Sequence, residues 1–263
     1  MRDLDDSRAP LMEHLIELRK RLIWSFITLG IAFAGCFYFA DKIFAFLAQP
    51  LVDAFGPGQG RMIYTKLYEA FFVEIRVALF AAFFLAFPII AMQIWLFVAP
   101  GLYAKEKRAF LPFLVATPVL FVMGAALAYY GVMPYAFHFF LGYEGSLGGI
   151  EQEALPAVGD YLSLVMHFIF AFGIAFLLPI LLMLLERAGL VTRKQLVDGR
   201  RYAILIAFVI AAVATPPDIL SQFMLAVPLI LLYELSLIAI WFTERRRAKD
   251  ALETPAESPA SDV

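Results

Sequence analysis

Two carboxylates stand beside clusters of basic residues, and their positions suit the binding of a cation. Glu17 lies in HLIELRKRL (14–22), directly before a long apolar stretch, and Glu106 lies in YAKEKR (103–108), between two apolar stretches. An acid on a strongly basic face stands out to a cationic ligand. A local explanation is equally available, because Glu17 can pair with Arg21 and Glu106 with a neighbouring lysine, each pair contributing about 0.2–0.5 kcal/mol. The residues alone leave both interpretations open.

Three other acids fall at or within apolar segments. Glu234 lies inside the last of these segments, and an ionisable group at membrane depth is a functional candidate by default. Asp218 follows two prolines and is expected to cap the helix after it, because a carboxylate there accepts unpaired backbone N–H groups. Glu69 precedes the second apolar segment, where we expect an ordinary interfacial pair with Arg76 or Lys66.

The histidines and the cysteine form no catalytic or metal-binding pattern in the sequence. His14, His138 and His167 are far apart and lack clustered carboxylates, and the single Cys36 excludes an intrachain disulfide. The sequence contains no phosphate-binding loop, H-E-x-x-H motif or nucleophile elbow. We therefore expect no enzyme activity, no metal and no cofactor, so that any work must draw on a partner or on the membrane potential.

Membrane-spanning helices must position these residues. Of the 263 residues, 62% are hydrophobic and 17% are charged, whereas about 25% are charged in soluble proteins. A helix crosses a bilayer with about 20 apolar residues. The sequence therefore predicts an all-α integral membrane protein with six spans, the last two of them short, at residues 22–40, 77–98, 110–134, 161–185, 203–216 and 219–242.

The distribution of basic residues predicts the orientation of the spans. Of the 21 Lys and Arg residues, 17 fall in alternate segments, starting with residues 1–21. Because such residues favour the cytoplasmic side, both termini are expected in the cytoplasm. We expect a cytoplasmic leader at 1–10, a single membrane domain at 11–243 and a disordered tail at 244–263, whose Pro-, Ser- and Glu-rich end cannot bury a core.

Prolines in or at the edges of the spans predict bent helices. Each proline removes a backbone donor and tends to kink its helix. Together they favour a kinked bundle with a concave face: Pro88, Pro118, Pro134, Pro179 and Pro228. Between the first two spans, residues 41–69 are expected to form short amphipathic helices with a break at Pro50.

Three separated motifs resemble a known family. HLIELRKRL (14–22), FVAPGLYAKEKR (97–108) and TPPDILSQ (215–222) together are similar to the TatC family of the twin-arginine protein translocase, in the right order and over almost the whole chain. The resemblance implies a receptor that binds signal peptides with consecutive arginines and the core of a translocon that exports folded proteins, driven by the protonmotive force. The signal-binding residues that it implies are Glu17, Arg19, Phe97, Leu102, Tyr103 and Glu106.

The resemblance also implies partners and a location. The family works with single-span TatA- and TatB-type subunits in a bacterial inner membrane, with self-association and without nucleic acid. Pro50 and Glu69 would belong to the external side, and Asp218, Gln222 and Glu234 to the last helical hairpin, in structural or partner-contacting roles. Two acids near one surface also suit two arginines, because guanidinium favours bidentate pairing with carboxylate.

One position departs from the family pattern. Many relatives carry a glutamate or glutamine within the fourth span, whereas this chain has Leu177 in AFLLP (175–179). A mechanism that requires a carboxylate at this position is therefore not supported here, and Glu234 is not taken as its replacement.

Two other functions fit parts of the sequence. A proton-coupled small-solute transporter would use the prolines within the spans and Glu234. A membrane scaffold without a ligand would treat Glu17 and Glu106 as solvated charges. Solute flux through the purified protein alone in liposomes would favour the transporter. Site-specific crosslinking from positions near both acids, with and without a signal peptide, distinguishes the scaffold from a signal-peptide receptor.

Overall fold

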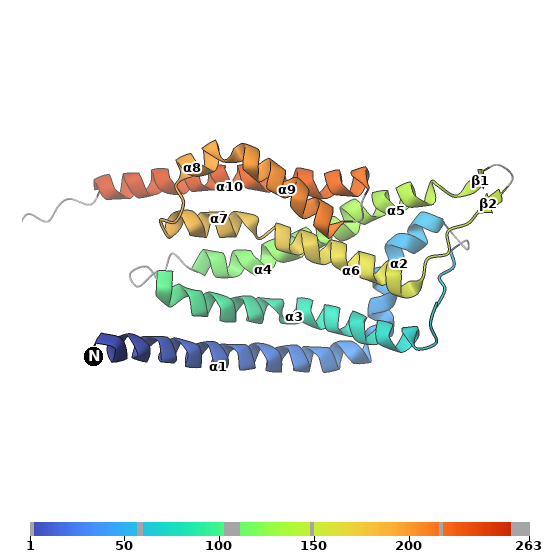
Figure 1. Ribbon diagram of the computed structural model, residues 1–263, viewed down its shortest axis with the longest axis horizontal. Coiled ribbons are helices and arrows are strands. Elements are labelled where there is room, and N and C mark those ends of the chain that lie inside the picture. The colour runs from blue at the N-terminus through green and yellow to red at the C-terminus, as the bar shows by residue number, and fades with distance from the viewer. Residues whose placement is uncertain (1–2, 57–59, 103–110, 148–149, 216–217, 254–263) are drawn as a thin grey trace, which may run out of the picture.

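The structure, a computed structural model, describes residues 3–56, 60–102, 111–147, 150–215 and 218–253. Its long helices run side by side along one long axis, whereas the helix that follows the first of them runs across it (Figure 1). Helix α1 (Asp3–Tyr38) begins at the end of the bundle where helix α10 (Ile219–Glu253) stops. We call this the terminal end, and we call the opposite end, which carries helix α2 (Ala40–Phe55), the distal end. The predicted all-α membrane class is confirmed.

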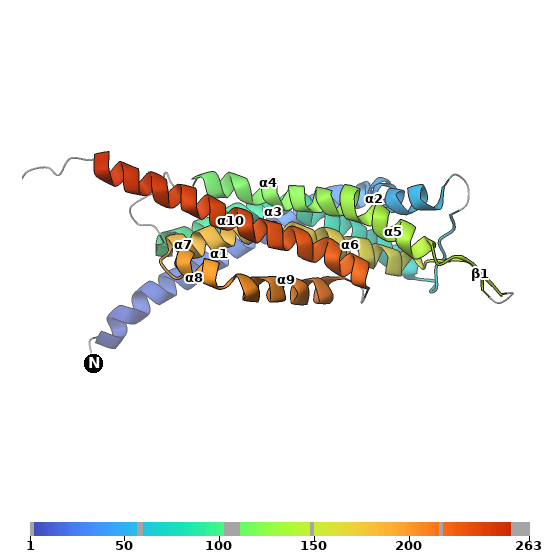
Figure 2. The same ribbon diagram turned by 90° about the horizontal axis from the view of Figure 1, so that it is seen from above.

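The first span belongs to one long helix. α1 has 36 residues and includes most of the predicted leader as well as the apolar stretch. It packs mainly on α3 (Glu69–Leu102), and its first turns slope away from the rest of the bundle (Figure 2). Many large apolar side chains of α1 are exposed, as expected for a helix that faces lipid or a partner: Met12, Leu15, Ile16, Leu22, Ile23, Trp24, Phe26, Ile27 and Ile31.

The predicted break at Pro50 is wrong, because α2 continues through this residue to Phe55. A proline has no N–H to bond the carbonyl four residues earlier, which here belongs to Phe46. The hydroxyl of Tyr129 donates to that carbonyl at 2.5 Å, and the Tyr161 hydroxyl donates to the neighbouring Leu47 carbonyl at 2.8 Å. The proline is therefore tolerated within the helix and exposes an acceptor through which α2 is held on the bundle.

The third span is a continuous helical segment with a π-helix in its middle. It comprises α4 (Leu111–Ala126), the π-helix η2 (Leu127–Val132) and α5 (Met133–Leu141). Pro134 lies in the first turn of α5. Its ring would collide with the carbonyl four residues earlier in a regular α-helix, and a π-turn gives room for it. Pro134 thus coincides with an interruption of the regular α-helix in its span.

The fourth span is broken into α6 (Val158–Ala175) and α7 (Leu178–Arg187). Pro179 lies in the first turn of α7, where its missing N–H costs no hydrogen bond. Leu177 stands at the break and packs, partly buried, against an apolar cluster that includes Phe87 and Trp95. An apolar residue therefore suits this position, where many relatives are polar.

The last two membrane helices differ in length. After the short helix α8 (Arg193–Asp198), α9 (Arg200–Ala214) has only 15 residues, as predicted. α10 is longer than predicted, with 35 residues, and it includes ten residues of the expected disordered tail. TERRRAKDALE (243–253) contains good helix formers without Gly or Pro, so the helix continues beyond the apolar block. The rest of the predicted tail, 254–263, lies outside the described residues.

Five segments of the described chain are long and apolar enough to cross a membrane, and α9 is not among them. They are His14–Tyr38, Glu69–Phe97, Pro112–Leu141, Val158–Arg187 and Ile219–Arg245. The remaining predicted crossing, at 203–216, corresponds to α9, which has 15 residues and packs on α10. At the distal end, two short strands, β1 (Gly145–Leu147) and β2 (Ile150–Gln152), pair antiparallel.

The core is centred on α6 and uses glycine to bring helices together. Phe121, Phe168 and Phe172 are fully buried. A Cβ on Gly124 of α4 would collide with the Phe172 backbone, and one on Gly173 of α6 would lie 2.7 Å from the Phe121 ring. Small residues thus let α4 and α6 pack closely, which is how helices associate in lipid.

We expect Tyr129→Phe to destabilise the protein, because the Phe46 carbonyl, four residues before Pro50, would lose the hydroxyl that donates to it. Leaving one buried acceptor unpaired costs about 1–3 kcal/mol. Thermal unfolding of the detergent-purified protein, followed by size-exclusion chromatography, measures the change. Tyr130→Phe is the matched control, because Tyr130 is exposed. Equal melting temperatures of the two variants would contradict this role of Tyr129.

Candidate functional site

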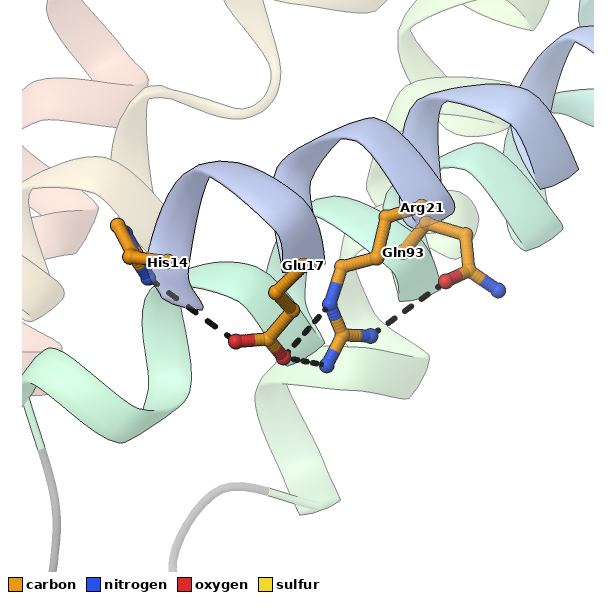
Figure 3. A network of polar contacts seen from close by, with 4 residues as sticks. All are labelled: His14, Glu17, Arg21 and Gln93. Carbon is orange, nitrogen blue, oxygen red and sulfur yellow. Dashed lines mark hydrogen bonds and ion pairs between the residues drawn. The ribbon is translucent and has the colours of Figure 1, made fainter. Parts of the chain in front are cut away.

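Glu17 is the centre of a polar network at the terminal end, where α1 packs on α3 (Figure 3). Oε1 of Glu17 accepts hydrogen bonds from Nε of Arg21, at 3.0 Å, and from Nη2 of the same side chain. The i,i+4 pair expected from the sequence is therefore confirmed. Nη1 of Arg21 also donates to Oε1 of Gln93 on α3, at 3.4 Å, so the network joins the two helices.

An aromatic contact lies beside this network. The ring of His14 stacks on that of Phe97, with centroids 4.2 Å apart and planes 16° from parallel. Nδ1 of His14 is 4.0 Å from Oε2 of Glu17. The structure thus brings Phe97, a predicted signal-binding residue, close to Glu17 from another helix. The site has an acid and a flat apolar surface side by side, a combination that suits a guanidinium with an adjoining apolar chain.

The remaining predicted signal-binding residues are placed only in part. Arg19 is exposed on α1, and within the described ranges no residue forms an ion pair with it. Leu102 is the last residue of α3. Tyr103 and Glu106 lie outside the described residues, so the proximity of Glu17 and Glu106 stays a prediction.

Sequence reasoning missed two members of the network. The sequence assigns neither His14 nor Gln93 to a binding site. A signal for Gln93 exists, because it is a polar residue within an uncharged apolar segment and lies one turn before Phe97 on α3. Its pairing with Arg21 crosses two helices and has no signature in local spacing.

At the distal end, Glu69 is an anchor for backbone groups and not half of a side-chain ion pair. Oε2 of Glu69 accepts hydrogen bonds from the backbone N–H of Thr65, at 2.7 Å, and of Lys66, at 3.2 Å. Oε1 accepts one from Gly159 N–H, at 2.7 Å, in the first turn of α6. The predicted pair with Arg76 or Lys66 is therefore wrong, because nearby unpaired N–H groups take both oxygens of the carboxylate.

The last hairpin is held by two residues of the third motif. Oδ1 of Asp218 accepts a hydrogen bond from Ser221 N–H at 2.7 Å, so the predicted cap of α10 is confirmed. Nε2 of Gln222 donates to the Phe208 carbonyl at 3.2 Å and ties α10 to α9. Both residues thus have structural roles in the described chain.

Glu234 is paired at the point where α9 begins. Nη2 of Arg200 lies 2.8 Å from its Oε2. The hydroxyl of the adjacent Tyr233 donates to the Leu196 carbonyl of α8 at 2.6 Å. The pair has no signature in the sequence, because no local spacing relates residues 34 positions apart. A charge pair that joins two helices explains Glu234 without a midplane binding site.

An open apolar groove of about 560 Å³ lies between α1, α2, α3, the third span and α6. It is lined by Cys36, Phe46, Phe80, Phe84, Tyr130 and Ile169, among others. The groove gives the bent helices a hollow face, as predicted, and its surface offers shape and apolar contact but few polar groups.

The fold and these contacts define a polytopic helical membrane protein in which ion pairs form within α1, between Glu17 and Arg21, and between α9 and α10, from Arg200 to Glu234. The sequence profile of the family described as Sec-independent protein translocase protein (TatC) matches residues 13–228. The chain belongs to this TatC family.

Individual relatives are similar over nearly the full length. The chain is 51% identical to the Sec-independent protein translocase protein TatC of Magnetococcus marinus, over 96% of this chain and 91% of the relative. It is 43% identical to that of Aquifex aeolicus, over 87% and 93%. A crystal structure of the twin arginine translocase receptor TatC matches with a TM-score of 0.72 and 42% identity, over 86% of this chain and 96% of that one. A second, in DDM, matches with a TM-score of 0.75 and 41% identity, over 86% and 98%.

We expect Glu69→Ala to loosen the distal end, because it removes the common acceptor of the segment before α3 and of the first turn of α6. The variant should unfold at a lower temperature and be cleaved faster by protease around residues 60–68. Limited proteolysis in detergent measures this. Glu74→Ala is the matched control, because Glu74 is an exposed carboxylate on the same helix. Equal cleavage of both variants would refute the anchoring role.

Proposed function

We propose that this chain is the signal-peptide receptor and core membrane subunit of a twin-arginine translocase, which exports folded proteins by use of the protonmotive force. Membership of the TatC family supports the class. The observation that carries the receptor role is the placement of Glu17 beside Phe97, where α1 packs on α3 at the terminal end.

In this proposal, Glu17 and Glu106 each bind one arginine of the signal. A carboxylate pairs with a planar guanidinium through two parallel hydrogen bonds, so two acids select consecutive arginines. In the sequence, Glu106 follows Leu102, the last residue of α3, by four positions, and α3 also contributes Phe97. Arg19, Leu102 and Tyr103 complete the binding surface. The apolar part of the signal lies along the bent helices.

The proposed setting is a bacterial inner membrane with the terminal end in the cytoplasm. Support comes from the basic segments: 17 of the 21 Lys and Arg residues fall in the alternate segments that include both termini. α1 begins and α10 ends on one side, as this orientation requires. The partners in the proposal are TatA- and TatB-type single-span subunits and further copies of this chain. The protein acts as a translocase component and not as an enzyme.

The small-solute transporter has less support. It depended on Glu234 as part of a binding site within the membrane, but Arg200 already pairs with that carboxylate. The family match does not favour it either, because the matched relatives are protein translocase components.

We expect Glu17→Ala and Glu106→Ala each to weaken binding of a twin-arginine signal peptide by at least tenfold, because each removes one charge-assisted pair worth about 1.5–3 kcal/mol. Binding of a fluorescent peptide to the protein in nanodiscs, followed by anisotropy, measures this effect.

The control variant is Glu74→Ala, which removes an exposed carboxylate near the distal end. The control ligand is the same peptide with two lysines in place of the arginines. Undiminished binding in both single variants and in the double variant would refute the site assignment.

A further inference from the structure

Without a ligand, the carboxylate of Glu17 is already occupied by a guanidinium. Arg21 directs both Nε and Nη2 at Oε1 of Glu17. The other oxygen, Oε2, has His14 at 4.0 Å as its nearest ionic partner among the described residues. The proposed binding group for an incoming arginine thus holds an arginine of the same chain.

This internal pair has the chemistry of the proposed ligand. A guanidinium presents a rigid fork of donors that binds both oxygens of a carboxylate at once. Arg21 fills the acceptor sites of Oε1, so an incoming arginine finds only Oε2 open and cannot bind both oxygens. An incoming arginine must therefore replace Arg21 or share Glu17 with it. Since both are cations, sharing is opposed by their repulsion, and replacement is favoured.

Gln93 gives the displaced side chain a second acceptor. Nη1 of Arg21 is 3.4 Å from Oε1 of Gln93, on a different helix from Glu17. Arg21 can therefore stay hydrogen-bonded to α3 while Glu17 is released. The exposed fractions fit this exchange, because the Glu17 side chain is 36% exposed and Arg21 only 20%. The acid faces the surrounding medium, and its internal partner lies deeper between the helices.

We propose that Arg21 is an internal competitor for the arginine-binding carboxylate, and that Gln93 weakens this competition because it gives the displaced Arg21 side chain an acceptor on α3. This inference rests on the proposed function. It makes binding an exchange of one guanidinium for another, so a ligand must offer Glu17 at least two fixed donors, as Arg21 does, to displace it. A lysine carries the same charge without that geometry and competes poorly, so the internal arginine sharpens selection for arginine.

The test is the affinity of Arg21→Gln for a twin-arginine peptide, measured with the full chain in nanodiscs. Removal of a partly exposed competitor should tighten binding about two- to fivefold, as expected from the strength of such pairs. A di-lysine peptide should gain more than the di-arginine peptide, so that discrimination between them falls. Lys20→Gln is the matched control, because it removes the same charge from the adjacent, exposed position and should change the affinity less than twofold.

A second variant tests the role of Gln93. Gln93→Leu should weaken peptide binding about two- to threefold in the presence of Arg21. The hydrogen bond from Arg21 to Gln93 is long and partly exposed, so its loss is expected to cost no more than the loss of a surface ion pair. The same change should have no effect in the Arg21→Gln background. If Gln93 had a purely structural role or contacted the peptide directly, Gln93→Leu would weaken binding equally in both backgrounds. That result would overturn this part of the inference.

The outcomes separate the inference from the proposed function. If wild-type protein does not discriminate the twin-arginine peptide from the di-lysine peptide, and Glu17→Ala changes nothing, the proposed function fails. If Glu17→Ala weakens binding but Arg21→Gln also weakens it, or matches Lys20→Gln, only the inference is overturned. If Arg21→Gln does not yield folded protein, the effect of Gln93→Leu in the wild-type background decides, because an unchanged or tighter affinity contradicts competition.

Discussion

The structure depends on one constraint: in a bilayer, polar groups must be paired within the protein, because no water is present to replace a missing partner. Two groups that would be costly if left unpaired have such a partner. The carbonyl left free by Pro50 receives the Tyr129 hydroxyl, and the charge of Glu234 is paired with Arg200. These contacts hold α2 on the bundle and α8 and α9 on α10.

The same constraint explains why the candidate site lies at one end of the molecule. Charged pairs are costly at the centre of the membrane and less so at its margins. Glu17, Arg21 and Gln93 pair where α1 packs on α3 at the terminal end, next to the stacked rings of His14 and Phe97. α1 is packed mainly on one helix and keeps a large exposed apolar face. It thus combines a polar site with a surface that remains available for apolar contacts.

Much of this could be predicted from the sequence where the cause is local. Apolar blocks predict the spans, the short span at 203–216 predicts a short α9, and Asp218 caps the helix directly after it. The links between Arg21 and Gln93, and between Arg200 and Glu234, could not be predicted, because they join residues far apart in the chain. Pro50 was misread for the same reason, since its compensation comes from another helix. The length of α10 was underestimated because hydropathy marks the end of a span but not the end of a helix.

The central claim is that arginines of a signal peptide bind at the terminal end, beside Glu17. Site-specific crosslinking tests it most directly, with a photoreactive residue at position 20, one turn after Glu17 on α1, and another at position 74 near the distal end of α3. We expect the residue at position 20 to crosslink to a twin-arginine peptide and only weakly to a di-lysine peptide. We expect the residue at position 74 to crosslink to neither peptide. Equal crosslinking of both peptides from position 20, or crosslinking from position 74 alone, would contradict it.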